Sequence, residues 1–145
     1  MKRAALAVVV LTLSVFGVSC FASTPSEGSR RLAETEDFPK LKTVASETLA
    51  ASGRDASPTY EAVEQCAGTD QFRAAGQYQF DRNSAPLQEM LRDVADLWDR
   101  QGSAWFDAVS VDRSLVDSHR RIELDVEGWS IRVDDAGLGI DGPCR

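Results

Sequence analysis

Few side chains in this chain could carry out acid–base or hydrolytic chemistry. His119 is the single histidine among 145 residues, and it directly follows Asp117 and Ser118. A catalytic triad is assembled in space from separate segments, and the sequence has no glycine-flanked serine elbow. The simpler interpretation of His119 is a solvated residue at the start of a strand.

Two groups of aspartates could bind a cation weakly. One group recurs at three-residue steps along a predicted helix, and the other surrounds a glycine-rich turn: Asp93, Asp96 and Asp99, and Asp134-Asp135 with Asp141. Calcium prefers oxygen ligands, but no loop of the EF-hand kind is present, and an exposed acidic helix face needs no ligand. We therefore predict no catalytic residue, no metal site and no cofactor.

The alternative is a small secreted or cell-wall-active hydrolase that uses the aspartate groups and His119. Such an enzyme requires at least two of these groups to converge in one concavity. The sequence does not bring them together.

The N-terminus has the layout of a secretory signal peptide. Lys2 and Arg3 precede an uncharged apolar run over residues 4–18, and Ser19 and Cys20 follow. Such a run enters the translocon while the charged end stays in the cytoplasm. Because the run is shorter than the ~20 residues that span a bilayer as a helix, a retained transmembrane anchor is less favoured.

The segment Gly17-Val18-Ser19-Cys20 resembles the lipobox of bacterial lipoproteins, although Gly17 stands where that family usually has an aliphatic residue. The resemblance implies that residues 1–19 are removed and that Cys20 becomes the lipid-attached N-terminus. The whole chain, ending in Gly142-Pro143-Cys144, also resembles small actinobacterial lipoproteins of unassigned function. Ordinary cleavage after Ala22 is the alternative, and it would give a secreted protein.

Acylation or removal of Cys20 leaves Cys66 and Cys144 as one pair. In an oxidising compartment we expect them to form a disulfide, which contributes on the order of 4 kcal/mol in the chain-entropy model. The net charge of -7 argues against nonspecific nucleic-acid binding and against adhesion to anionic lipid. Membrane attachment, at the extracytoplasmic face, must then come through the acyl chains.

The remaining chain predicts a polar, flexible tether over residues 20–36 and a single domain over 37–145. Apolar spacing predicts a helix over 38–52 that ends at Gly53, and a second over 84–102 between an N-cap at Ser84 and a C-cap at Gly102. Alternation predicts a strand over 72–80, and β-forming residues suggest another over 105–111.

The last part of the chain predicts a hairpin whose register can be assigned. A two-residue turn at Glu127-Gly128 pairs Val126 with Trp129, Leu124 with Ile131 and Ile122 with Val133 on one apolar face. Its other face sets Glu123 against Arg132 and Arg121 against Asp134. A short strand carrying Leu138 and Ile140 follows.

This order of elements predicts an α+β two-layer sandwich, with two helices on one face of an antiparallel-rich sheet of four to five strands. We expect an exported, lipid-anchored, non-catalytic module that binds or scaffolds another envelope protein or a small ligand.

Overall fold

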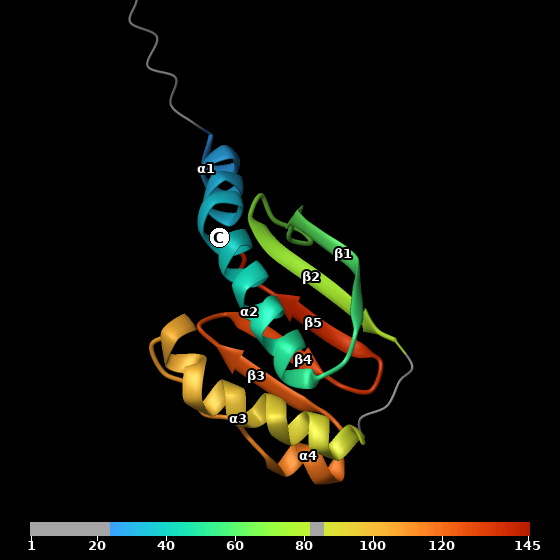
Figure 1. Cartoon of the computed structure of the whole chain (residues 1–145). Coiled ribbons are helices and arrows are strands. Elements are labelled where there is room, and N and C mark those ends of the chain that lie inside the picture. The colour runs from blue at the N-terminus through green and yellow to red at the C-terminus, as the bar shows by residue number, and fades with distance from the viewer. Residues whose placement is uncertain (1–23, 82–85) are drawn as a thin grey trace, which may run out of the picture.

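The computed structural model describes residues 24–81 and 86–145. The predicted signal peptide, the lipobox with Cys20, and the predicted N-cap Ser84 lie outside the described residues. The described chain folds into two layers, with helices on one face of a sheet (Figure 1). The predicted α+β sandwich is confirmed.

The sheet has five strands, all antiparallel, in the order β1-β2-β5-β4-β3. Their bounds are β1 Ala56–Gln65, β2 Phe72–Phe80, β3 Ile122–Val126, β4 Trp129–Val133 and β5 Gly137–Asp141. The last strand of the chain lies between the hairpin β1-β2 and the hairpin β3-β4, so it joins them into one sheet (Figure 1).

The helical layer is built from α2 (Phe38–Ser52) and α3 (Leu87–Trp105). The predicted helix over 38–52 is confirmed, and Gly53 ends it with a left-handed φ of 62° that glycine adopts without strain. Within the core, the Trp98 indole of α3 donates a hydrogen bond of 3.1 Å to Thr48 Oγ1 of α2. This bond satisfies two polar groups that burial would otherwise penalise.

The predicted hairpin register is confirmed at every pair from Ile122 opposite Val133 to Val126 opposite Trp129. The helix-facing side chains of the three C-terminal strands are almost fully buried: Ile122, Leu124, Trp129, Ile131, Val133, Leu138 and Ile140. Alternation in these strands therefore separates a core face from a solvent face.

The flexible tether predicted for residues 20–36 is wrong for residues 25–36. These residues form α1 (Pro25–Leu32) and a π-helical turn, η1 (Ala33–Asp37), that leads into α2. Thr24 and Glu27 form a capping box at the start of α1. The helix docks through the buried Ser29 rather than through an apolar stripe, and that is why the hydrophobic pattern missed it.

The strand predicted over 105–111 and the helix end predicted at Gly102 are also wrong. The helix α3 continues to Trp105, and residues 106–112 are irregular before the short helix α4 (Ser114–Ser118). A Cβ on Gly102 would lie 2.7 Å from Val109 Cγ2, so glycine is needed here for close packing and not as a cap.

Candidate functional site

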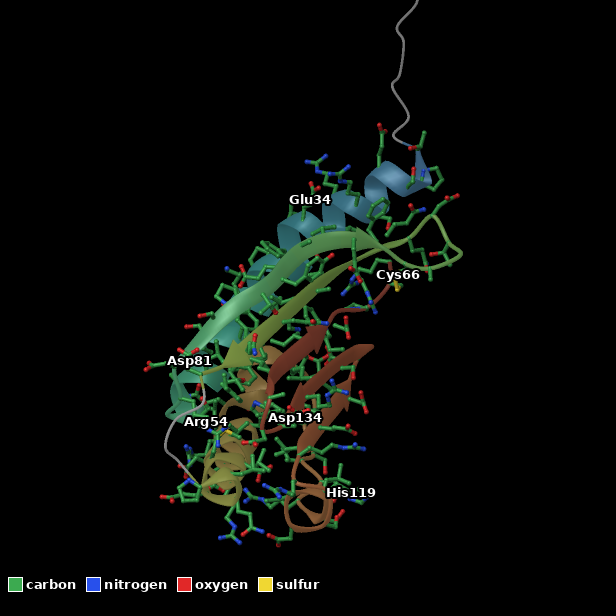
Figure 2. All side chains as sticks on the ribbon, turned by 90° about the vertical axis from the view of Figure 1, so that its right-hand side faces the viewer. Glu34, Arg54, Cys66, Asp81, His119 and Asp134 are labelled. Atoms are coloured by element: carbon green, nitrogen blue, oxygen red, sulfur yellow. A yellow bond between two sulfur atoms is a disulfide. The ribbon has the colours of Figure 1, made fainter. Side chains whose placement is uncertain are left out.

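Within residues 24–81 and 86–145, the helices leave the other face of the sheet uncovered. Figure 2 shows the two layers from the side, with α2 and α3 on one side of the strands. The exposed face carries mainly polar side chains, as the alternating burial of β4 illustrates: Ser130 and Arg132 are exposed between three buried residues. We take this open face as the candidate site because it is where the fold presents an organised surface to solvent.

A hollow of about 760 Å³ lies on the open face, and its lining includes residues of all five strands. Its middle is formed by β5, whose residues Gly137 and Gly139 pair with Gln79 and Gln77 of β2. A Cβ on Gly139 would meet nothing within 4 Å, so the missing side chain leaves open space there. The volume lies within the range of ordinary ligand sites.

Gly137 has a different role from Gly139. A Cβ on Gly137 would lie 1.9 Å from the backbone oxygen of Tyr78, a distance at which two atoms overlap. Gly137 is thus required by the close approach of two strands, whereas Gly139 shapes the hollow.

The four carboxylates that line the hollow are each paired with an arginine. The pairs are Glu123 with Arg121 at 3.0 Å, Asp134 with Arg132 at 3.7 Å, Asp135 with Arg54 at 3.1 Å, and Asp141 with Arg73 at 3.4 Å. Such partly exposed pairs add little stability, but they balance the local charge. The predicted pairing of Arg121 with Asp134 is wrong, because Arg121 pairs with Glu123 and Asp134 pairs with Arg132.

Two amides of β2 face the hollow. Gln77 and Gln79 are exposed, and within residues 24–81 and 86–145 neither side chain has a hydrogen-bond partner. Two residues along a strand place the two amides about 7 Å apart on the same face. Each amide offers two N–H donors and a carbonyl acceptor, so together they form an unused set of hydrogen-bonding groups.

Tyr60 of β1 lies at one side of this row, opposite Gln77. Its side chain is held by a hydrogen bond of 2.7 Å from its hydroxyl to Glu64 Oε2, and Arg73 donates to the other oxygen of Glu64. The bond to Glu64 raises the pKa of Tyr60, and the bonds from Tyr60 and Arg73 lower the pKa of Glu64. An aromatic side chain that is 40% exposed and held by Glu64 thus lies on the open face beside Gln77, next to the lining residue Thr59.

Two of the three helical aspartates are engaged by an arginine. Arg113 bridges Asp96 and Asp99, at 2.6 Å and 2.5 Å, and so offsets part of the charge of this acidic face, while Asp93 is not among its partners. No group of three or more potential metal ligands occurs among the residues that the structure describes.

His119 lies in the turn after α4, close to Ser118 Oγ at 2.7 Å from its Nδ1. Asp117 pairs with Arg92 instead, and Ser118 also donates to the Ser114 carbonyl, so the contiguous Asp117-Ser118-His119 does not form a triad. His119 does not line the hollow, and Figure 2 shows it at the end of the molecule remote from Cys66. The structure brings three of the predicted aspartates to the hollow and leaves His119 apart: Asp134, Asp135 and Asp141.

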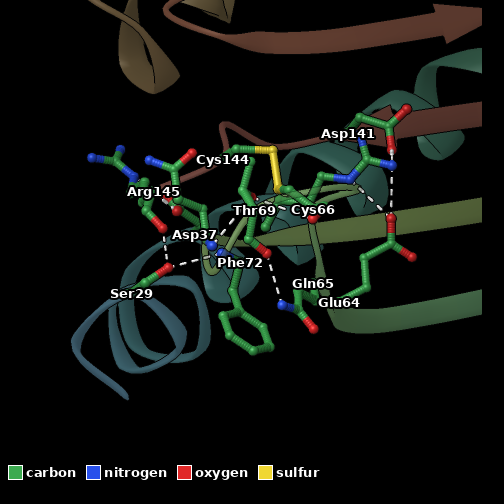
Figure 3. The surroundings of a disulfide bond; sticks show 12 residues. Ser29, Asp37, Glu64, Gln65, Cys66, Thr69, Phe72, Asp141, Cys144 and Arg145 are labelled. Carbon is green, nitrogen blue, oxygen red and sulfur yellow. Dashed lines mark hydrogen bonds and ion pairs between the residues drawn. A yellow bond between two sulfur atoms is a disulfide. The ribbon is translucent and has the colours of Figure 1, made fainter. Parts of the chain in front are cut away.

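The predicted disulfide between Cys66 and Cys144 is present, with a Cα–Cα distance of 6.2 Å (Figure 3). It joins the end of β1 to the segment after β5. Arg145, next to it, exchanges two backbone hydrogen bonds with Phe72, and its side chain pairs with the buried Asp37 at 2.9 Å.

Ser29 completes this cluster, since its hydroxyl donates to the Arg145 carbonyl and accepts from the Phe72 backbone N–H (Figure 3). The disulfide therefore holds the chain segment on which α1 docks. The π-helical turn over residues 33–37 ends at the buried Asp37, the partner of Arg145.

Sequence reasoning missed the residues that form the hollow. The alternation of β2 sets Gln77 and Gln79 on its polar face, but gives no reason to connect them with Gly139. Two glycines at alternate positions of a strand, both on the polar face, are the signal that could have indicated a recess.

No protein-family model, no curated protein and no solved structure matches this chain. Its class is therefore defined by its own architecture, a two-layer α+β domain with one open sheet face. Among the described residues, none of the helices has both the length and the apolar character needed to cross a bilayer.

Proposed function

We propose that this chain is an exported, lipid-anchored envelope protein that acts as a non-catalytic binding module through the open face of its sheet. The observation that carries the proposal is the hollow around Gly139, which is lined by residues from five strands and flanked by the free amides of Gln77 and Gln79. An organised polar recess of ligand size on a rigid sheet is what a binding module requires.

The absence of a proximate acid–base pair supports binding over catalysis. Within the described residues, each carboxylate of the hollow is paired with an arginine, and the histidine is elsewhere. A general acid or base needs a perturbed pKa and access to the reacting group. The carboxylates of the hollow are instead held in ion pairs with Arg54, Arg73, Arg121 and Arg132.

The anchor and the domain are closely coupled in this proposal. Cys20 precedes Thr24, the N-cap of α1, by four residues. Four residues span at most roughly 14 Å when extended. Acyl chains on Cys20 would therefore hold α1 near the bilayer surface. Because α1 docks on the sheet, the sheet would also lie close to the bilayer.

The anchor is tested by the mass of the mature N-terminus. We expect a diacylated Cys20 and no residues before it. An N-terminus at Ser23 indicates ordinary secretion, and an intact Met1 contradicts export; either result overturns the anchor.

The binding role is tested with the purified mature protein immobilised beside its Gly139→Val variant. Valine at this position places a side chain in the recess, and no atom lies within 4 Å of the place that its Cβ would take. We expect envelope material to be retained by the natural protein and lost with the variant. Equal retention by both proteins, or retention by neither, contradicts binding through the hollow.

A further inference from the structure

We propose that the ligand of the hollow is an uncharged oligosaccharide, bound across the strands between Tyr60 and Arg132. This inference rests on the proposed binding function and names the chemistry of its ligand. The evidence for this ligand is one row of residues that runs across the strands on the open face. Sheet pairing places the row in the order Tyr60, Gln77, Gly139, Arg132, Glu123.

The charge of the site favours a neutral ligand. Every carboxylate of the lining has an arginine partner within 4 Å, and Arg73 is shared between Asp141 and Glu64, so no excess of positive charge is left to attract an anion. A phosphate or a nucleic acid needs clustered, available cations, and here the arginines are engaged by carboxylates. The chain as a whole, with a net charge of -7, repels polyanions as well.

The hydrogen-bonding groups of the row suit hydroxyls. The amides of Gln77 and Gln79 both donate and accept, as sugar hydroxyls do, and their side chains have no partner in the described part of the chain. The Glu123 carboxylate and the Arg132 guanidinium add an acceptor and donors at the other end of the row. These exposed amides suit a polar ligand, because hydrogen bonds to its hydroxyls can replace those that the amides make with water.

The shape of the row suits a flat ring. Gly139 lets a ligand approach the backbone of β5, because no side chain stands above it. Tyr60, 40% exposed and held by Glu64, supplies an apolar ring surface at the other side of Gln77. Sugars present both hydroxyls and apolar C–H faces, and an amphipathic aromatic side chain beside amides complements both.

An extended peptide fits this place less well. The usual way for a sheet to bind a peptide is to add a strand at an edge. The hollow instead lies over β5, which pairs on one side with β2 and on the other with β4, so its backbone groups are already engaged.

The test is a titration of the ¹⁵N-labelled mature protein, followed through the side-chain amide signals of Gln77 and Gln79. The probes are neutral tetrasaccharides of glucose, galactose and N-acetylglucosamine, with a tetramer of galacturonic acid as the anionic comparison. We expect at least one neutral probe to shift both amides, with a Kd of roughly 1 mM or tighter, and the anionic probe to bind more weakly.

Three variants give the titration its controls. Gly139→Val should abolish the shifts, and Gln77→Ala should weaken binding roughly 3-fold to 10-fold, which corresponds to one lost hydrogen bond. Gly28→Val adds the same atoms on α1, where a Cβ would also meet nothing within 4 Å, and should leave the affinity unchanged.

The proposal is overturned if no neutral probe shifts the amides, if Gly139→Val binds as the natural protein does, or if the anionic probe binds more tightly. Retention of envelope material that depends on Gly139, together with no response to any neutral sugar, overturns the oligosaccharide and leaves the binding role standing. If envelope retention does not depend on Gly139 and no neutral sugar shifts the amides, the binding role and the oligosaccharide are both overturned.

Discussion

The two faces of the sheet differ in role: the covered face stabilises the fold, and the open face forms the proposed binding surface. The covered face is apolar and closed: Ile131 and Val133 of β4 are fully buried, and between them Arg132 points to the other side. The open face has polar side chains, arginine–carboxylate pairs and a recess over Gly139. Neighbouring residues of one strand therefore serve different purposes, because successive side chains of a strand point to opposite faces.

The comparison also explains where the fold can tolerate change. A residue on the covered face fills space that no neighbour can fill, whereas most open-face residues contact solvent and one partner. We therefore expect substitutions on the two faces to separate stability from binding, and the following predictions test that separation.

The largest difference in the free energy of unfolding is expected between substitutions at two adjacent residues of β4. Ile131→Ala removes a fully buried side chain and should lower the free energy of unfolding by about 2–5 kcal/mol. Arg132→Ala, on the open face, should change it by about 0.5 kcal/mol or less. Urea unfolding of both variants measures this, and similar losses for the two would remove the distinction between the faces.

Loss of the disulfide should destabilise the fold without changing the open face. Replacing Cys66 and Cys144 together by serine should cost about 4 kcal/mol, since the bond closes a separation of 78 residues. Hydrogen exchange should accelerate most in α1, which docks on Arg145 beside the bond. Unchanged exchange in α1 would contradict the coupling between the disulfide and this helix.

The two glycines of β5 provide a matched pair. Gly137→Ala places a Cβ against the Tyr78 carbonyl and should destabilise by about 1–3 kcal/mol. Gly139→Ala has open space and should be neutral, or stabilising by roughly 0.4–1 kcal/mol, because alanine restricts the unfolded chain. Thermal unfolding compares them, and an equal loss from both would show that Gly139 also serves backbone packing.

The smallest effect is expected at the edge of the covered face, where Lys42 and Tyr78 both donate hydrogen bonds to Glu61. These bonds, that from Lys42 first, lower the pKa of Glu61. The contribution of Glu61 to the free energy of unfolding is therefore present at neutral pH. It is lost as the pH falls below the ordinary glutamate pKa of about 4.3 toward the lower pKa of the folded state.

We accordingly expect Glu61→Gln to be less stable than the natural protein by under about 1 kcal/mol at pH 7, and to equal it in strong acid. Denaturant unfolding from pH 7 to pH 2 measures the difference. A difference that stays constant over this range would contradict a role for the ionised carboxylate.

Local patterns predicted those parts of the fold in which the nearest neighbours along the chain decide the structure. The β3-β4 hairpin is one such part, because any shift of register would move Leu124 and Ile131 to solvent. The helix α2 is another, since Leu41, Val44 and Thr48 share one face and Gly53 ends it.

Distant contacts decided the parts that were predicted wrongly. Gly102 resembles a helix cap, but it lies inside α3 because Val109 packs against it. The segment around Ser29 has no apolar period, and its position is set by Arg145 and Phe72, far away in the sequence. Hydrophobic periodicity contains no information on such polar docking.

The candidate site could not be predicted for a similar reason. Its row depends on β5 lying between β2 and β4, which places Gly139 beside both Gln77 and Arg132. The contact of β5 with β4 follows from their order in the chain, but neither hairpin signals the pairing of β5 with β2, because these two strands are remote in the sequence. The disulfide was predicted because the count of cysteines, once Cys20 is set aside, leaves one pair.

The central claim, that the open face is the one occupied in the envelope, is tested most directly by hydroxyl-radical footprinting of intact cells. Tyr60 and Leu32 are almost equally exposed, at 40% and 41%, and lie on the open face and on α1. We predict that Tyr60 is oxidised in the purified protein and in cells carrying Gly139→Val, but is protected in cells carrying the natural protein. Equal oxidation of Tyr60 in all three samples, or protection of Leu32 alone, would contradict the claim.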